Sequence, residues 1–304
     1  MKDPIETFLS RLQHPVMTGI DYNLDRMHRL LAMLRNPERR LPPVVHVAGT
    51  NGKGSLIACL RAVVEHAGYK PHVYTSPHLV EFRERIILAG EMATNAQIES
   101  VLRYVGQSLS QLPATFFEAS TAAALLLYAQ HKADVLLLEV GLGGRLDATN
   151  VVDKPLLTAI TPISFDHMEY LGNTIEKIAA EKAGIIKRGV PCVVGRQTPE
   201  ALAVISQKAA DMQAPLRVLG RDFSWRREGA GAIYNDTKGE VSFAPALAGE
   251  HQFDNAATAI ACLREMPSLP VSASQISEGL AKTQWPARLQ RLLRGPLVDQ
   301  LSAT

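Results

Sequence analysis

An apolar run that breaks into a glycine-rich loop, residues 44–55, constrains the fold of this chain more than any other segment. Its sequence is Val-Val-His-Val-Ala-Gly-Thr-Asn-Gly-Lys-Gly-Ser. The run predicts a buried strand, and the loop predicts a turn into a helix that begins near Lys53. Backbone N–H groups, the positive end of that helix and the Lys53 ammonium together suit a nucleotide phosphate. We assign the phosphate contacts to Thr50, Asn51, Gly52, Lys53, Gly54 and Ser55.

The remaining pattern predicts an α/β fold. From about residue 43 to residue 220, short apolar runs alternate with longer helical patterns. Such alternation is typical of a mostly parallel sheet with helices on both faces. Residues 135–138 are apolar without alternation, which indicates a central strand buried on both sides. Residues 222–243 instead predict a small antiparallel β meander, and two helices are expected after it, at about 252–264 and 274–283.

Polar side chains follow the predicted strands at one edge of the sheet. Ser76, Glu139 and the pair Asp166-His167 fall at the carboxyl ends of strands, as the phosphate loop does. A carboxylate that ends a buried strand opposite a phosphate loop is costly to bury unless a cation or hydrogen bonds compensate it. Mg²⁺ is the natural cation there, because Ser55 and Ser76 add neutral oxygen ligands.

Composition excludes several classes of protein. With 304 residues, 46% of them apolar and 20% charged, the chain can bury a large core. A formal net charge of +2, with Lys and Arg spread over the whole length, provides no basic stripe for nucleic acid. No run of about 18 apolar residues predicts a membrane span, and the first residues show no apolar signal core, so we expect a cytoplasmic protein. The isolated Cys59, Cys192 and Cys262 indicate buried reduced thiols.

Four further motifs complete a family resemblance. They are residues 75–79, 115–118, 139–150, and Asp166-His167 with the downstream segment 181–187. The loop departs from the standard Walker A pattern, since Gly54 replaces its Ser or Thr. Together the motifs resemble bacterial folylpolyglutamate synthases, of the type that also acts as dihydrofolate synthase, in the Mur ligase superfamily. The resemblance implies a P-loop-type Mur ligase ATPase domain at 1–285. Because the family continues into a C-terminal glutamate-ligase domain, we interpret 286–304 as a linker and stub and expect a truncated chain.

The resemblance also implies metal, nucleotide and catalytic residues. It places Ser76, Glu139 and His167 around magnesium and Ser55 near a phosphate-side ion, so that two Mg²⁺ ions are expected. Imidazole is an unusual ligand for Mg²⁺, so the metal role of His167 rests on the resemblance, and the alternative is a satisfied histidine at a strand end. Lys182 corresponds to a lysine that is carbamylated in related ligases, although on residues alone it is a solvated or snorkelling lysine on a helix. The nucleotide contacts that the resemblance implies are Gln252, Asn255 and Arg288, the last of which reaches the γ-phosphate.

For the acceptor, the resemblance implies a pterin pocket. It is formed by Thr115, Phe117 and Asp147, with Ile20 and Asp21 nearby. An aromatic face can stack on a flat heterocycle, and a carboxylate can accept hydrogen bonds from ring N–H groups. The residue types leave a second interpretation open, because paired phenylalanines at the start of a helix are usually core residues.

These expectations combine into a monomeric ATP- and Mg²⁺-dependent ligase. It would add L-glutamate to dihydropteroate, to folates or to both through an acyl phosphate, with no protein nucleophile. One alternative is another Mur-type ligase that joins an amino acid to a peptidoglycan precursor, and the motifs at 115–118 and 141–150 argue against it. The other alternative is a nucleotide- or folate-binding remnant without catalysis. ATP binding without ligation would distinguish it.

Overall fold

The structure is a computed structural model, and it describes residue 5, residues 23–290 and residue 298. Ile20 and Asp21, which the resemblance assigned to the pterin pocket, lie outside the described residues. None of the described helices combines the length and the apolar character that crossing a bilayer requires. All three cysteines are buried and free, as the sequence predicted.

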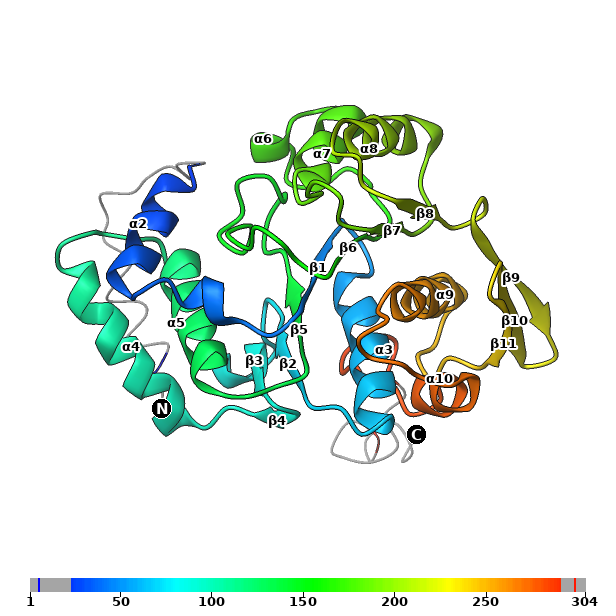
Figure 1. The fold of residues 1–304 in the computed structure, drawn as a ribbon, viewed down its shortest axis with the longest axis horizontal. Helices are drawn as coiled ribbons and strands as arrows, with labels where there is room; N and C mark the ends of the chain where they lie inside the picture. The colour runs from blue at the N-terminus through cyan, green and yellow to red at the C-terminus, as the bar shows by residue number, and fades with distance from the viewer. Residues whose placement is uncertain (1–4, 6–22, 291–297, 299–304) are drawn as a thin grey trace.

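An eight-stranded sheet forms the centre of the molecule (Figure 1), with the order β4-β3-β2-β5-β1-β6-β7-β8. Its parallel strands are β1 (Val44–Ala48), β2 (Pro71–Tyr74), β5 (Val135–Glu139), β6 (Leu157–Ile160), β7 (Cys192–Val194) and β8 (Leu216–Val218). At one edge, β3 (Ile86–Leu88) and β4 (Glu91–Met92) pair antiparallel. The prediction of a mostly parallel sheet is confirmed.

Helices cover both faces of this sheet, as Figure 1 shows. One face carries α3 (Lys53–His66) and α9 (His251–Arg264), with α10 (Ala273–Leu280) packed against α3. The other face carries α5 (Phe116–Gln130), α7 (Ile175–Ala183) and α8 (Pro199–Asp211), with α2 (Asp25–Met33) and α4 (Asn95–Leu109) packed against α5. Short elements complete the description: α6 (Met168–Leu171) and the 3-10 helices η1 (Pro37–Arg40) and η2 (Phe82–Arg85).

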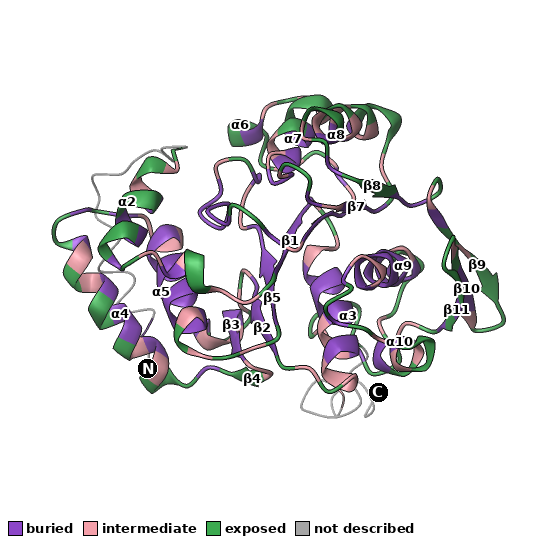
Figure 2. Cartoon of the chain, in the orientation of Figure 1, coloured by how far each residue is buried: buried purple, intermediate pink, exposed green. Residues whose placement is uncertain are grey.

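The central strands are buried on both sides, which Figure 2 shows as continuous purple through β1 and β5. Val45 and Val47 of β1 belong to the core cluster that contains α3 and α9. Val44 belongs instead to the cluster that contains α2, α4 and α5. Because side chains alternate between the faces of a strand, a strand with cores on both sides is mostly apolar on both faces, and His46 of β1 and Glu139 of β5 are the exceptions in these two strands.

A separate three-stranded antiparallel sheet follows β8 and confirms the predicted meander. Its strands are β9 (Phe223–Glu228), β10 (Gly231–Asp236) and β11 (Gly239–Phe243), in the order β11-β10-β9. Its apolar face packs on α9, where the Phe253 ring lies 5.2 Å from the Trp225 ring and 6.0 Å from the Phe243 ring. The meander therefore shares the core of the α3 and α9 layer.

Five helices begin where the sequence offers a capping Ser or Thr, whereas α2, α3, α6 and α9 begin without a side-chain cap. A Ser or Thr side chain accepts a hydrogen bond from the first turn of each of five helices: Thr94 for α4, Thr115 for α5, Thr174 for α7, Thr198 for α8 and Ser272 for α10. The pattern did not predict α2, α4 or the β3–β4 pair. Strands of two and three residues are too short to show a periodic pattern.

Candidate functional site

The glycine-rich loop connects β1 to α3, which begins at Lys53 as predicted. Gly52 has a φ of +90°, and a Cβ there would lie 2.6 Å from the Asn255 Oδ1 atom, so glycine is required on both grounds. Asn255 in turn donates to the Gln252 Oε1 atom at 2.9 Å, and Gln252 Nε2 lies 3.5 Å from Ser55 Oγ. The fold thus brings the two predicted nucleotide residues of α9 against the phosphate loop.

Two lysines meet at this loop. Lys53 Nζ and Lys182 Nζ each donate to the Gly49 carbonyl oxygen, both at 3.1 Å. Lys182 is 3% exposed, so the interpretation of a solvated lysine is wrong. Burial, together with the neighbouring charge of Lys53, lowers the pKa of Lys182 to about 8. A substantial fraction of Lys182 is therefore a neutral amine in mildly alkaline solution.

Glu139, at the end of β5, places a buried carboxylate beside Lys53. Its Oε1 lies 4.0 Å from Lys53 Nζ, and its Oε2 accepts a hydrogen bond of 3.2 Å from the Ser76 N–H. Burial raises the pKa of Glu139 to about 7, against the lowering effects of Lys53, Ser76 and Arg288. A cation beside Glu139 would favour its ionised form, so the buried carboxylate and the serine oxygens fit a hard ion such as Mg²⁺.

His167 fits a metal less well than Glu139 does. It stands in the left-handed region at φ 47°, immediately before α6, and its ring lies 3.5 Å from the Asp166 carboxylate with more than half of the side chain exposed. Among the described residues, no group of three His, Cys, Asp or Glu side chains is arranged to hold a metal. A metal ion at Glu139 would therefore depend on hydroxyl, substrate and water oxygens for its other ligands.

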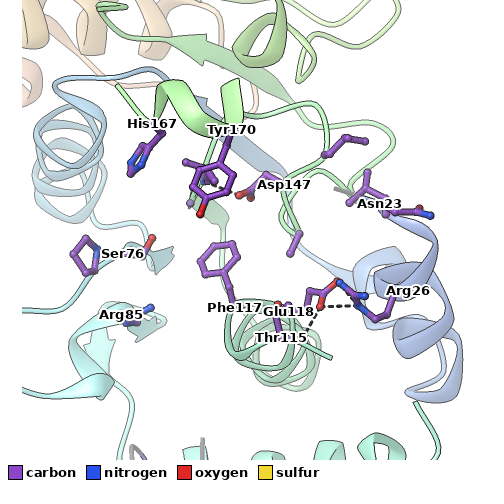
Figure 3. Close-up of a pocket in the computed structure, with 16 residues that line it drawn as sticks. Asn23, Arg26, Ser76, Arg85, Thr115, Phe117, Glu118, Asp147, His167 and Tyr170 are labelled. Carbon is purple, nitrogen blue, oxygen red and sulfur yellow. Dashed lines mark hydrogen bonds and ion pairs between the residues drawn. The ribbon is translucent and has the colours of Figure 1, made fainter. Parts of the chain in front are cut away.

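A cavity of about 480 Å³ opens beside Ser76 and contains the three described residues predicted for the pterin (Figure 3). Thr115, Phe117 and Asp147 all line it, together with Ser76 and His167. The lining also includes residues that the sequence did not single out: Asn23, Leu24, Arg26, Pro77, Arg85, Glu118, Gly141, Leu142, Leu146, Ala148 and Tyr170. Pro77, Glu118 and the residues of the 141–148 loop lie inside motifs that the sequence analysis identified, whereas no local pattern marks Arg26.

Residues at the start of α5 form part of the cavity wall. Thr115 caps the helix, and its N–H donates at 2.7 Å to the Glu118 carboxylate in a capping box. Arg26 Nε donates to both oxygens of Glu118 at 2.9 Å, which Figure 3 shows as dashed lines. Because Arg26 belongs to α2, this ion pair attaches α2 to the cavity.

Asp147 reaches the cavity from the loop after β5. Its Oδ2 atom accepts from the Leu142 N–H at 2.8 Å, and its Oδ1 atom accepts from the Thr149 N–H at 3.0 Å. Burial raises the pKa of Asp147, and these hydrogen bonds oppose that rise. Asp147 thus offers the cavity a fixed carboxylate rather than a freely rotating one.

The side chain of Phe117 depends on a glycine opposite. A Cβ on Gly141 would lie 2.2 Å from Phe117 Cζ, so only glycine lets the ring occupy this place. We expect Gly141→Ala to push the ring into the cavity and to weaken pterin binding about tenfold or more, given the usual cost of overpacking. Isothermal titration with dihydropteroate measures this effect.

Gly195→Ala provides the matched control for that substitution. A Cβ on Gly195 would have its nearest neighbour at 3.4 Å, an ordinary contact, and its φ is not positive. We expect this variant to bind the pterin as the unaltered chain does. Equal affinities for the Gly141→Ala and Gly195→Ala variants would contradict the assignment of Phe117 to the cavity wall.

Comparisons with known proteins identify the family of this chain. Residues 47–263 match the Mur ligase middle domain family. The chain is 39% identical to the dihydrofolate synthase/folylpolyglutamate synthase of Bacillus subtilis, over 92% of this chain and 68% of that protein. It is 36% identical to the folylpolyglutamate synthase of Lacticaseibacillus casei, over 90% of this chain and 67% of that protein.

Solved structures show the same likeness in three dimensions. The Escherichia coli FolC complex with DHPP and ADP matches with a TM-score of 0.87 and 36% identity, over 95% of this chain and 68% of that one. An FPGS complex with AMPPCP and folate matches with a TM-score of 0.86 and 33% identity, over 95% of this chain and 74% of that one. The chain therefore belongs to the folylpolyglutamate synthase/dihydrofolate synthase family and carries its Mur ligase middle domain.

Proposed function

We propose that this chain binds the nucleotide and the pterin in an ATP- and Mg²⁺-dependent ligase that joins L-glutamate to dihydropteroate, to folates or to both. The observation that carries the proposal is the junction between the phosphate loop and the cavity. Ser76 lines the cavity and donates its N–H to Glu139, and Glu139 lies 4.0 Å from Lys53. The relatives whose structures contain ADP with DHPP, or AMPPCP with folate, support the same pairing of ligands.

In the proposed reaction, a carboxylate oxygen of the pteroate or folate attacks the γ-phosphorus of ATP, and ADP leaves. The amine of L-glutamate then attacks the acyl phosphate carbon, loses a proton and releases inorganic phosphate as the amide forms. Lys53 and Arg288 neutralise the negative charge that moves between the phosphates, which is the main requirement of phosphoryl transfer. No protein nucleophile takes part.

We further propose Ser55, Ser76 and Glu139 as the magnesium ligands. Bound Mg²⁺ would supply positive charge and orient the phosphate oxygens. The expected number of two ions and the role of His167 remain part of this proposal. Carbamylation of Lys182 belongs to it as well, because addition of CO₂ needs a neutral amine and the pKa of Lys182 is lowered to about 8.

In the cavity, Phe117 would stack on the pterin while Asp147 accepts hydrogen bonds from its ring N–H groups. Thr115 would contact the same ligand, with Ile20 and Asp21 contributing from the N-terminal segment. The division into a nucleotide-binding domain at 1–285 and a linker with a domain stub at 286–304 stays a prediction, as do the monomeric state and the cytoplasmic location.

Transfer of labelled L-glutamate by the complete gene product tests the proposed function. We expect a glutamyl amide to form only with ATP, Mg²⁺ and dihydropteroate or a folate present. Nucleotide and pterin binding without any product would favour the non-catalytic binder. Transfer to a peptidoglycan precursor instead would favour the other Mur-type ligase.

A further inference from the structure

A buried histidine of the central strand contacts the loop that carries Asp147. His46 of β1 is 0% exposed, and its Nε2 atom lies 2.9 Å from the Thr149 hydroxyl oxygen. Burial lowers the pKa of His46 to about 3, so its imidazole is neutral. The proposed reaction does not use this histidine. An apolar side chain such as valine would be less costly to bury in this strand, so the histidine needs another explanation.

The hydrogen-bond directions follow from the groups present. The Thr149 hydroxyl donates to Asp147 Oδ1 at 2.5 Å, and a hydroxyl has only one proton to donate. In the contact with His46, the Thr149 hydroxyl oxygen must therefore be the acceptor. The His46 ring carries its proton on Nε2 and donates it to that oxygen. A neutral imidazole then has a bare Nδ1, and His46 Nδ1 is indeed a buried atom without a hydrogen-bond partner among the described residues.

The three side chains form a directed chain from the sheet to the cavity. His46 donates to Thr149, and Thr149 donates to Asp147 through both its hydroxyl and its N–H. All three residues are buried, at 5% exposure or less, so water does not compete for these bonds. The Asp147 Oδ1 atom accepts both hydrogen bonds from Thr149, while Oδ2 accepts a hydrogen bond from the Leu142 N–H. Rotation of the carboxylate would break bonds on both oxygens.

We propose that His46 and Thr149 are positioning residues that hold the Asp147 carboxylate in the orientation that receives the pterin. This inference rests on the proposed function, since Asp147 is taken there as the pterin acceptor. A rigid β1 strand is a better anchor than the 141–150 loop, because β1 pairs with β5 on one side and β6 on the other. Neither positioning residue lines the cavity, so both act through Asp147.

Thr149→Val tests the chain of bonds, because valine keeps the shape of threonine and lacks the hydroxyl. We expect the affinity for dihydropteroate to fall about tenfold or more, as for loss of a hydrogen bond to a charged group. Thr149→Ser keeps the hydroxyl and should bind within about threefold of the unaltered chain. His46→Leu should lower the affinity for dihydropteroate. His46→Gln should retain most of the affinity of the unaltered chain, because its amide N–H can replace the Nε2–H as the donor to Thr149.

Two readouts separate positioning from a general effect on stability. Affinity for an ATP analogue should stay unchanged in all four variants, because within the described part of the chain no side-chain hydrogen bond joins His46 or Thr149 to the phosphate loop. Nitrogen NMR of the His46 ring should show a neutral imidazole with its proton on Nε2, and the pKa of Asp147 measured by carboxyl NMR should rise in Thr149→Val.

The outcomes also separate this inference from the proposed function. If the unaltered chain binds nucleotide and no pterin, the proposed function fails, and the NMR data still decide whether His46 and Thr149 hold Asp147. If the unaltered chain binds the pterin and Thr149→Val binds it equally well, the positioning role is overturned. A proton on His46 Nδ1, or an Asp147 pKa that does not change in Thr149→Val, overturns the directed chain itself.

Discussion

Lys53→Ala is expected to lower the rate of glutamyl transfer by the complete gene product on the order of a thousandfold, as removal of a charge-stabilising donor can. The fold should persist, because the loop takes its shape from glycines and not from this side chain: Gly49 and Gly52 both have positive φ. Loss of the ammonium would also leave Glu139 without its cationic neighbour at 4.0 Å. Turnover assays together with thermal melting measure both effects.

Lys132→Ala serves as the control for this substitution. Lys132 is exposed and lies between α5 and β5, at the amino end of that strand and away from the phosphate loop. We expect its variant to retain full turnover. Near-normal turnover by Lys53→Ala would refute the assignment of the phosphate loop, whereas loss of the melting transition would show that Lys53 is needed for folding.

Glu139→Gln is expected to raise the magnesium requirement and to reduce turnover by about a hundredfold or more, because it removes the negative charge that a hard cation prefers. His167→Ala should have a much smaller effect, since imidazole is a poor ligand for Mg²⁺ and this ring is largely exposed. Magnesium titrations of turnover for both variants give the comparison. Equal or reversed effects would mean that the ion is held elsewhere.

The same carboxylate predicts a dependence on pH. Since burial raises the pKa of Glu139 to about 7, protonation should compete with Mg²⁺ below that value, and magnesium affinity should fall as the pH drops from 8 to 6. Without metal, the raised pKa means that protonated Glu139 stabilises the folded state. This contribution to the free energy of unfolding is fully present below pH 4.5, the pKa of Glu139 in the unfolded chain, and is lost as the pH rises through about 7. Glu139→Gln should remove both dependences.

Local chemistry made much of the site predictable. The loop at 49–55 needs glycines where the backbone turns sharply, and Gly52 has the positive φ that this implies. Motifs at the ends of strands were enough to place Ser76 and Glu139 together, because the carboxyl ends of parallel strands share one edge of the sheet. Thr115 and Phe117 came instead from the family resemblance, because the residue types alone left open that the paired phenylalanines belong to the core.

Contacts between distant segments could not be predicted from the residues. Lys182 looks like a solvated helix lysine, yet packing of α7 buries its amine at the Gly49 carbonyl, 133 residues away in the sequence. Arg26 joins Glu118 across 92 residues, and no local pattern marks it. These partners depend on how helices pack on the sheet, and side-chain periodicity specifies only which face of a helix is apolar.

The sequence by itself thus determined the phosphate loop, the parallel sheet and the family, because each depends on short-range rules of backbone turns, strand burial and motif spacing. The tertiary structure alone decided the direction of the hydrogen bonds from His46 to Asp147, the pairing of Arg26 with Glu118 and the burial of Lys182. The physical reason is that burial and hydrogen-bond geometry depend on neighbours that only the packed fold brings together, and these neighbours set the charge and the orientation of each group.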